Sequence, residues 1–323
     1  MNTKKEMEGL SPRRLRNLAV VLGIGAFLSI VLQGVLSFAI PTQAEMLAQQ
    51  DTAEEIRSTQ SINPFDGILL EARAVYVFDL KTNKVLFARN ENEKLPLASV
   101  TKIMTALLAR EQVSESAVIT LSKNDLAMEG DSGLRPSERW RTGDLLNVML
   151  LVSSNDAAHA VSLFVGGKDF QGEPRDAQKH FVSMMNGKAL SLGLSKMEFS
   201  NESGLDISET QNGGYGSAHD VAFLFSELWR KYPETVEVTA RRDSRIVSQD
   251  NLAHVLLNTN EIVGQIPGLI ASKTGYTKLA GGNLAVIFDR GIGDPIVAVV
   301  LGSGYKGRFD DMKKLVVAAN NAW

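Results

Sequence analysis

The 323-residue sequence contains no cysteine, and this absence excludes several kinds of chemistry. Without a thiol, the chain forms no disulfide, uses no thiolate nucleophile and builds no cysteine-ligated zinc site. Its four histidines are scattered and none falls in an H-E-x-x-H pattern, so we expect neither a metal nor another cofactor. The net charge is −3 and no long basic block follows the N-terminus, which argues against a nucleic-acid partner.

The N-terminal part differs in composition from the rest. Residues 1–17 are basic and precede an apolar run, residues 18–40, that makes about 34 Å of helix, enough to cross a bilayer core. The basic flank predicts a cytoplasmic N-terminus and an extracytoplasmic domain after Ile40. Residues 18–40 are either a transmembrane signal anchor at the cell membrane, which we favour, or a signal peptide cleaved after Ala44 to give a secreted or periplasmic protein. Residues 45–66 are polar and acidic and predict a linker.

Residues 67–323 are predicted to form one catalytic domain in which strands flank a helical middle. Because strands from both ends of this region must share a sheet, the middle is expected to form a second, helical lobe, with a ligand groove between the two parts. Strands are predicted over 74–80, 85–89, 283–288 and 295–302, and helices from 103, over 142–152, from 155, and over 177–192, 217–229 and 309–322.

A serine and a lysine stand three residues apart where the first helix begins, in LPLASVTKIMTALLA. Pro96 lies just upstream, and the residues from Ile103 onward are mostly apolar, so the segment predicts a buried helix. Ser99 and Lys102 then share one face of the first turn. One explanation is a helix cap, Ser99, beside a solvated lysine. The other is a serine nucleophile with Lys102 as its base.

Two further short motifs favour the second explanation. Ser153 and Asn155 form an S-x-N motif between two predicted helices, and residues 273–275 form a K-T-G motif on a predicted strand edge. Alone, each motif is weak, because turns are rich in serine and asparagine and a strand glycine often marks a bulge. Together and in this order, S-x-x-K, S-x-N and K-T-G are typical of penicillin-binding proteins and class A β-lactamases.

From about Arg73 to Asp310 the chain resembles the D-alanyl-D-alanine carboxypeptidase family, the low-molecular-weight penicillin-binding proteins of peptidase family S11. The stretches that carry the resemblance include VFDLKTNKVLF, PLASVTKIMTALLA, SGLRPSERWRTGDLLNVMLLVSSNDAA and NTNEIVGQIPGLIASKTGYTKLAGGNLA. The resemblance implies an α+β fold of the β-lactamase/transpeptidase type, in which an antiparallel sheet flanked by helices carries an all-α lobe.

The same resemblance implies a serine-type DD-carboxypeptidase that removes the terminal D-alanine from peptidoglycan stem peptides ending in D-Ala-D-Ala. Ser99 would form the acyl-enzyme, and β-lactams would be covalent inhibitors. Lys102 would be the base, which requires its pKa to fall by roughly three units through burial and the like charge of Lys273. Ser153 would relay a proton to the leaving amine.

The remaining site residues would bind substrate. Asn155 would hold a backbone amide, and Lys273 with Thr274 would attract the C-terminal carboxylate. Gly275 would leave the strand edge bare for an extended peptide. The resemblance adds the backbone N–H groups of Ser99 and Tyr276 as an oxyanion hole, and Arg308 near the carboxylate end of the site, where the alternative is a solvated surface arginine.

The sequence also departs from neighbouring families. The E-x-x-L-N loop of class A β-lactamases is absent, and SNESGLDIS with Glu202 stands in its place, so we expect penicillin to acylate Ser99 and remain attached. The chain stops at Trp323, which predicts no C-terminal β domain and makes the N-terminus the expected membrane attachment. The alternatives are a DD-endopeptidase, transpeptidase or β-lactamase on the same scaffold, or a non-catalytic wall-binding protein tethered to the membrane.

Overall fold

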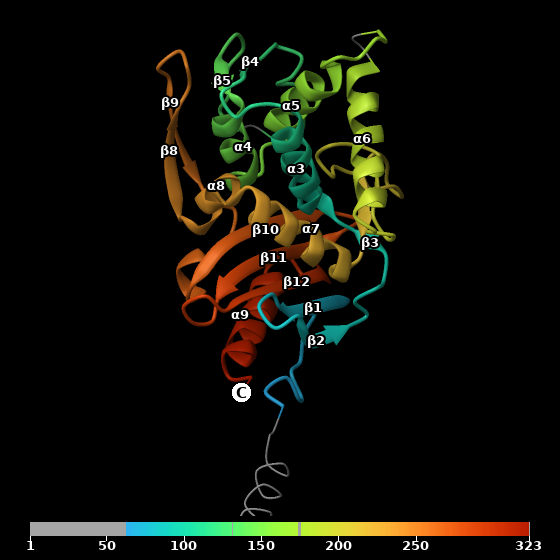
Figure 1. Cartoon of the computed structure of the whole chain (residues 1–323), viewed down its shortest axis with the longest axis vertical. Coiled ribbons are helices and arrows are strands. Elements are labelled where there is room, and N and C mark those ends of the chain that lie inside the picture. Colours follow the sequence, from blue (N-terminus) through green and yellow to red (C-terminus); the bar gives the residue numbers. More distant parts are fainter. Residues whose placement is uncertain (1–62, 131, 174–175, 323) are drawn as a thin grey trace, which may run out of the picture. The chain divides into compact units, whose positions relative to one another are not determined.

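The computed structural model describes residues 63–130, 132–173 and 176–322. The predictions for residues 1–17 and 18–40, and for the linker up to residue 62, therefore lie outside the described residues. Within the described ranges, no helix combines the length and the apolar character that a bilayer span requires. The described chain is built from a sheet layer and a helical lobe (Figure 1).

A five-stranded antiparallel sheet forms the lower layer in Figure 1. As predicted from the strand order, strands from the two ends of the domain pair in it, with Ala74 opposite Leu301. The order across the sheet is β10 (Leu269–Thr277), β11 (Gly281–Asp289), β12 (Pro295–Ser303), β1 (Ala74–Asp79) and β2 (Lys84–Arg89). The strand that carries K-T-G, β10, lies at the edge of this sheet, as its sequence predicts.

The sheet is buried on both faces, and its central strands are accordingly apolar in consecutive runs rather than at alternate positions only. On one face Val75, Val77 and Val300 pack with α9 (Gly307–Asn320). On the other face Tyr76 and Leu301 belong to the core shared with the helical lobe, and α7 (Ala218–Lys231) lies against β1 and β12. The sheet thus packs against α9 on one face and against the helical lobe on the other.

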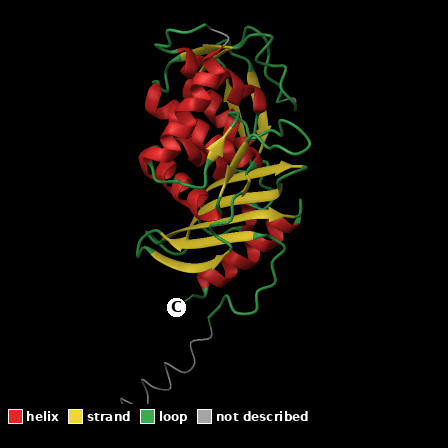
Figure 2. Ribbon diagram, turned by 90° about the vertical axis from the view of Figure 1, so that its right-hand side faces the viewer, coloured by secondary structure: helices red, strands yellow, loops and turns green. Residues whose placement is uncertain are grey.

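Most of the helices gather above the sheet, whereas α9 lies below it (Figure 2). The central helix α3 (Lys102–Gln112) is buried over its first eight residues, which explains its apolar sequence. Around it lie α4 (Thr142–Leu151), α5 (Asn155–Gly167), α6 (Ala177–Ser191) and the short α8 (Pro233–Glu237). The helices predicted from the sequence are all present, with the stated ends displaced by at most two residues.

Several short strand pairs were not predicted. They comprise β4 (Val118–Thr120) with β5 (Arg139–Arg141), β8 (Asp243–Val247) with β9 (Ala253–Leu257), and β3 (Leu95–Pro96) with β7 (Gly214–Gly216) and β6 (Glu198–Phe199). Strands of two to five residues give too short an alternation to be recognised. The last group matters for the site, because β3 leads directly into a 3₁₀ helix, η1 (Ala98–Thr101), that passes beside β10.

Candidate active site

Ser99 and Lys102 lie where η1 passes into α3, and their side chains are in contact. Lys102 Nζ lies 2.9 Å from Ser99 Oγ. Ser99 does not cap either helix, since neither η1 nor α3 has a side-chain cap bond at its start. Lys102 is fully buried, so the solvated-lysine explanation is wrong. Ala98 precedes the serine with φ +48°, a left-handed conformation that non-glycine residues adopt mainly where a site requires it.

The Lys102 amine has three oxygen partners and no contact with solvent. Besides Ser99 Oγ, Nζ donates to Asn155 Oδ1 at 2.7 Å and to the carbonyl of Ser203 at 2.9 Å. Burial lowers the pKa of Lys102 to about 7, while the charge of Glu202 acts in the opposite direction. At neutral pH a large fraction of this amine is therefore uncharged, as a base acting on a serine hydroxyl requires.

Lys273 on β10 brings a second buried amine to the site. Its Nζ donates to Ser153 Oγ and to the carbonyl of Thr274, each at 2.8 Å. Burial, followed by the charges of Lys102 and Arg308, lowers the pKa of Lys273 well below its ordinary value. The sequence led us to expect that burial and the charge of Lys273 together lower the pKa of Lys102; the structure confirms the effect of burial and shows the repulsion between the two amines at Lys273.

The turn between α4 and α5 serves both amines. Ser153 bonds Lys273 and Asn155 bonds Lys102, so the two polar side chains of the S-x-N motif face one site. Ser153 has φ +62°, again a left-handed non-glycine residue. Ser154, between them, caps α5 by accepting the backbone N–H of Ala157. The structure thus brings together five of the predicted residues from three separate segments of the chain: Ser99, Lys102, Ser153, Asn155 and Lys273.

Gly275 is needed for packing, a reason that the sequence did not suggest. A Cβ at this position would stand 2.8 Å from the carbonyl oxygen of Leu97 and 3.2 Å from the backbone nitrogen of Ser99. Only glycine lets β10 approach the turn that carries the serine so closely. On either side of it, Thr274 is buried and contacts Thr259 Oγ1 at 2.6 Å, whereas the Tyr276 side chain is half exposed.

Arg308 is not a surface arginine. It is 4% exposed, and Nη1 donates to the carbonyl of Gly275 at 2.8 Å. Its guanidinium lies over the ring of Tyr305, 4.6 Å from the ring centre, and Tyr305 in turn meets Tyr276 edge to face. Arg308 therefore ties the start of α9 to the K-T-G strand, and its charge reaches Lys273.

The family of the protein follows from its sequence. The model of the D-alanyl-D-alanine carboxypeptidase family, peptidase family S11, matches residues 59–304, about three quarters of the chain. The chain belongs to this family. Among similar members, DacB2 of Mycobacterium tuberculosis is 30% identical over 72% of this chain and 75% of its own length. DacF of Bacillus subtilis is 33% identical over 64% of this chain, and the match spans only 51% of that relative.

Solved structures of S11 relatives share the fold. A D-alanyl-D-alanine carboxypeptidase from Mycobacterium tuberculosis superposes with a TM-score of 0.68 at 26% identity, over 80% of this chain and 96% of that one. Penicillin-binding protein D2 of Listeria monocytogenes, solved in its ampicillin-bound form, gives 0.65 at 29% identity over 78% and 98%. The protein therefore has the α+β fold of the penicillin-binding proteins, as its sequence predicts.

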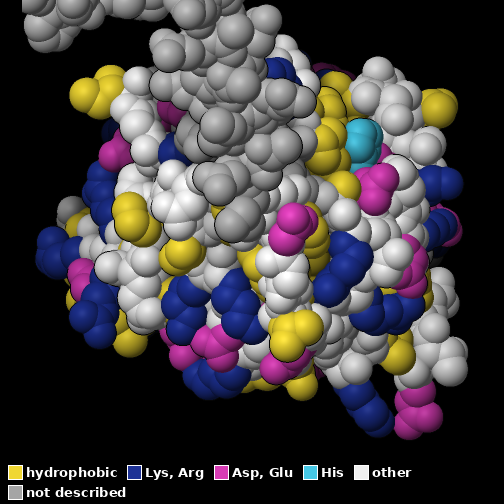
Figure 3. Space-filling model, turned by 90° about the horizontal axis from the view of Figure 1, so that it is seen from below, with side chains coloured by type: hydrophobic (Ala, Val, Ile, Leu, Met, Phe, Trp, Pro, Cys, Tyr) yellow, Lys and Arg dark blue, Asp and Glu magenta, His cyan; other side chains and the backbone are white. Residues whose placement is uncertain are grey.

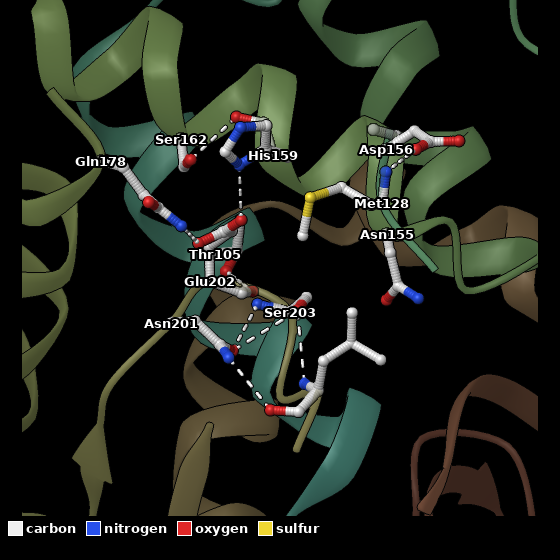
Figure 4. A network of polar contacts seen from close by, with 12 residues as sticks. Thr105, Met128, Asn155, Asp156, His159, Ser162, Gln178, Asn201, Glu202 and Ser203 are labelled. Atoms are coloured by element: carbon white, nitrogen blue, oxygen red, sulfur yellow. Dashed lines mark hydrogen bonds and ion pairs between the residues drawn. The ribbon is translucent and has the colours of Figure 1, made fainter. Parts of the chain in front are cut away.

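Two residues of the site were given no role by the sequence. Glu202 was noted only as the wrong pattern for a β-lactamase, and His159 only as one of the scattered histidines. In the structure they contact each other (Figure 4), and the carbonyl of Ser203, the residue after Glu202, accepts a hydrogen bond from Lys102 Nζ. They lie 43 residues apart in different elements, and no local pattern signals such a pair.

Proposed function

We propose that this protein is a penicillin-binding serine DD-carboxypeptidase that removes the terminal D-alanine from peptidoglycan stem peptides. The observation that carries the proposal is the contact between Ser99 Oγ and a fully buried Lys102 amine whose pKa is about 7. Membership of the S11 family supports the same activity. The arrangement is that of a hydroxyl nucleophile with a neutral base already in hydrogen-bond contact.

In the proposed reaction, Ser99 Oγ attacks the carbonyl carbon between the two terminal D-alanines while Lys102 accepts the hydroxyl proton. The C–N bond then breaks, the amine of the last D-alanine takes up a proton through Ser153, and an ester to Ser99 remains. Water hydrolyses this ester and restores the hydroxyl. The hydrogen bond between Lys273 Nζ and Ser153 Oγ supports the relay role of Ser153, and the hydrogen bond from Lys102 Nζ to Asn155 Oδ1 helps to hold the base in place.

The substrate's terminal carboxylate is proposed to bind near Lys273 and Thr274. In the ligand-free site, burial and like charges disfavour the ammonium form of Lys273. A carboxylate restores that form by supplying the missing opposite charge. The two neighbouring tyrosines, Tyr276 and Tyr305, are about half exposed beside this strand and border the same region.

We also propose that β-lactams acylate Ser99 and are released slowly. The ampicillin complex of the Listeria relative supports the first part. For the second, Glu202 is fully buried and both its carboxylate oxygens accept hydrogen bonds, from His159 and Gln178, so it does not activate a water at Ser99. The site therefore lacks a glutamate that activates the deacylating water, as class A β-lactamases have, and we expect hydrolysis of the penicilloyl ester to be slow.

Two measurements test the proposal. A fluorescent penicillin should label the wild-type protein and not Ser99→Ala, and a pentapeptide ending in D-Ala-D-Ala should release free D-alanine. Labelling without D-alanine release, together with cleavage of cross-linked stem dimers, would favour an endopeptidase. Absence of labelling in the folded wild-type protein would favour a wall-binding protein without turnover.

We propose in addition that the domain is held at the outer face of the cell membrane by residues 18–40. The apolar run and its basic flank support this location. The end of the domain seen from below displays Lys and Arg side chains among hydrophobic and acidic ones (Figure 3). An apolar groove there is lined by Pro64, Leu69 and Val317 beside Lys313 and Lys314, a composition compatible with anionic lipid headgroups. Alkaline carbonate extraction of native membranes and mass spectrometry of the mature N-terminus test the proposal; a chain that begins at Glu45 would refute it.

A further inference from the structure

A buried acid–histidine pair lies directly behind the Ser99–Lys102 contact, and the proposed reaction does not use it. Glu202 is fully buried in the loop that follows β6. Its two carboxylate oxygens accept hydrogen bonds from His159 Nδ1 on α5 at 2.9 Å and from Gln178 Nε2 on α6 at 2.8 Å (Figure 4). Moving a carboxylate from water into a protein interior costs free energy, so buried carboxylates are found where they are fully paired or have a defined function.

The backbone of the same residue is fixed to the helix that carries the base. The carbonyl of Glu202 accepts the hydroxyl of Thr105 on α3 at 2.6 Å. The next carbonyl, that of Ser203, accepts Lys102 Nζ at 2.9 Å. The side chain of Asn201 closes the loop by accepting the backbone N–H groups of Ser203 and Gly204. The loop therefore presents one of the three acceptors of the Lys102 amine, and Glu202 anchors it from behind.

The loop also touches the turn that holds the nucleophile. Gly204 has φ +79°, and a Cβ there would stand 1.9 Å from the carbonyl oxygen of Ala98. A displacement of this loop would consequently shift the positions of both Ser99 and Lys102. Errors of about 1 Å in such a position cost on the order of a hundredfold in rate.

The pair also carries a variable charge. Burial acts to raise the pKa of Glu202, but the hydrogen bonds from His159 and Gln178 outweigh it, so this pKa lies below its ordinary value and the group is ionised. The hydrogen bond to Glu202 raises the pKa of His159 against the opposing effect of burial, and Asp125 and Asp156 add to the rise. With His159 protonated the pair is neutral; with His159 neutral it carries one negative charge, which favours the ammonium form of Lys102.

We propose that Glu202 and His159 are positioning residues for the reaction base: they hold the Ser203 carbonyl against Lys102, and the net charge of the pair sets how readily Lys102 gives up its proton. The proposal rests on the serine peptidase function proposed above and deepens it. Other charged groups facing the two amines and the histidine are Lys273, Arg308, Asp125 and Asp156. None of these needs to be changed in the test, so their effects remain constant.

The test is the pH dependence of Ser99 acylation by a fluorescent penicillin, measured by stopped flow on the full chain. His159→Gln keeps a donor to Glu202 but leaves the carboxylate uncompensated at every pH. The acid limb of the rate profile should then move to higher pH, by roughly one unit for a unit charge acting over a short distance of protein interior. Glu202→Gln removes the negative charge that favours the ammonium form of Lys102, so its limb should move to lower pH. The double variant should follow Glu202→Gln.

The chain offers a matched control. His254 Nε2 and Glu138 Oε1 form a second buried histidine–glutamate pair at 2.7 Å, which joins β9 to the residue before β5, on elements that carry none of the site residues. His254→Gln and Glu138→Gln should leave the limb in place. Thermal unfolding of every variant identifies loss of fold. If His159→Gln fails to fold, the direction of the shift in Glu202→Gln and in the double variant still decides.

The outcomes separate the two levels of the argument. A wild-type protein that is not acylated refutes the proposed function itself. The role of the pair alone is refuted if the wild-type profile shows an acid limb and the limbs of His159→Gln and Glu202→Gln coincide with it. It is also refuted if both limbs move in the same direction. An equal shift in the His254 and Glu138 controls refutes it as well. Limbs that move apart in the predicted directions support the proposal, because a merely structural role lowers the rate without displacing the profile.

Discussion

Burying the Lys102 amine makes the stability of the folded protein depend on pH in a measurable direction. In the folded state this group loses its proton near pH 7, whereas in the unfolded chain it keeps the proton to about 10.5. Between these values the unfolded state binds more protons, so the free energy of unfolding rises as the pH rises. The interval is 10.5 minus 7, or 3.5 units, and at about 1.4 kcal/mol per unit the gain amounts to about 5 kcal/mol.

The Lys102→Met variant isolates this contribution, because methionine keeps much of the apolar stem and cannot titrate. We expect the unfolding free energy of the wild type minus that of the variant to increase steadily from pH 7 to pH 10. Urea unfolding followed by circular dichroism at each pH gives both values, and groups that titrate alike in the two proteins cancel. Lys273 responds to the charge of Lys102, so the pair of measurements is repeated with Lys273→Met in both proteins.

A difference that stays flat across this range would refute the reasoning. It would mean that Lys102 titrates alike in the folded and unfolded chains, and the amine would then be charged at neutral pH. The same result would remove the base from the proposed reaction. A difference that rises only above pH 9 would mean that the pKa of Lys102 is lowered too little for the amine to be uncharged at neutral pH.

Three further outcomes follow from the site geometry. Gly275→Ala places a methyl group 2.8 Å from the carbonyl of Leu97, so penicillin acylation, followed by stopped flow, should slow by about ten- to a hundredfold while the circular dichroism spectrum is retained. Arg308→Met removes the donor to the Gly275 carbonyl, and urea unfolding should show a loss of about 1–3 kcal/mol; an unchanged midpoint would contradict the contact. A stem peptide with a free C-terminus should bind Ser99→Ala with uptake of a proton, because its carboxylate favours the ammonium form of Lys273, so the binding enthalpies measured in two buffers of different ionisation enthalpy should differ; equal enthalpies would contradict the proposed carboxylate site.

The sequence predicted those parts of the fold that depend on local periodicity. The strands β1, β2, β11 and β12 are apolar runs bounded by polar turns, and the helices show the expected apolar faces. The pairing of β1 with β12 followed from the strand–helix–strand order, because strands from the two ends of the domain had to share one sheet. The three motifs marked the site for a different reason: their combination is specific even though each alone is common.

The features that escaped prediction depend on contacts between distant segments. The β8–β9 hairpin is short and half exposed, so its alternation is weak. Gly275 lies on β10 against η1, and nothing near it in the chain reveals that neighbour. Burial of Arg308 depends on the β10 edge reaching the start of α9. The meeting of His159 and Glu202 requires α5 and the loop after β6 to converge on α3, which only the assembled lobe specifies.

The two lysines explain why one turn must supply two different polar side chains. Lys102 and Lys273 share a buried site, and two ammonium groups there would repel each other with little screening. Asn155 accepts from one amine and Ser153 from the other, so each lysine is held by its own partner and the two nitrogens keep separate tasks. The number of protons in the site then depends on what enters it. If a carboxylate binds near Lys273 as proposed, it will stabilise the ammonium of Lys273, and that charge will in turn favour the neutral, basic form of Lys102. We therefore expect a substrate that ends in a carboxylate to favour the neutral base more than an amidated one does.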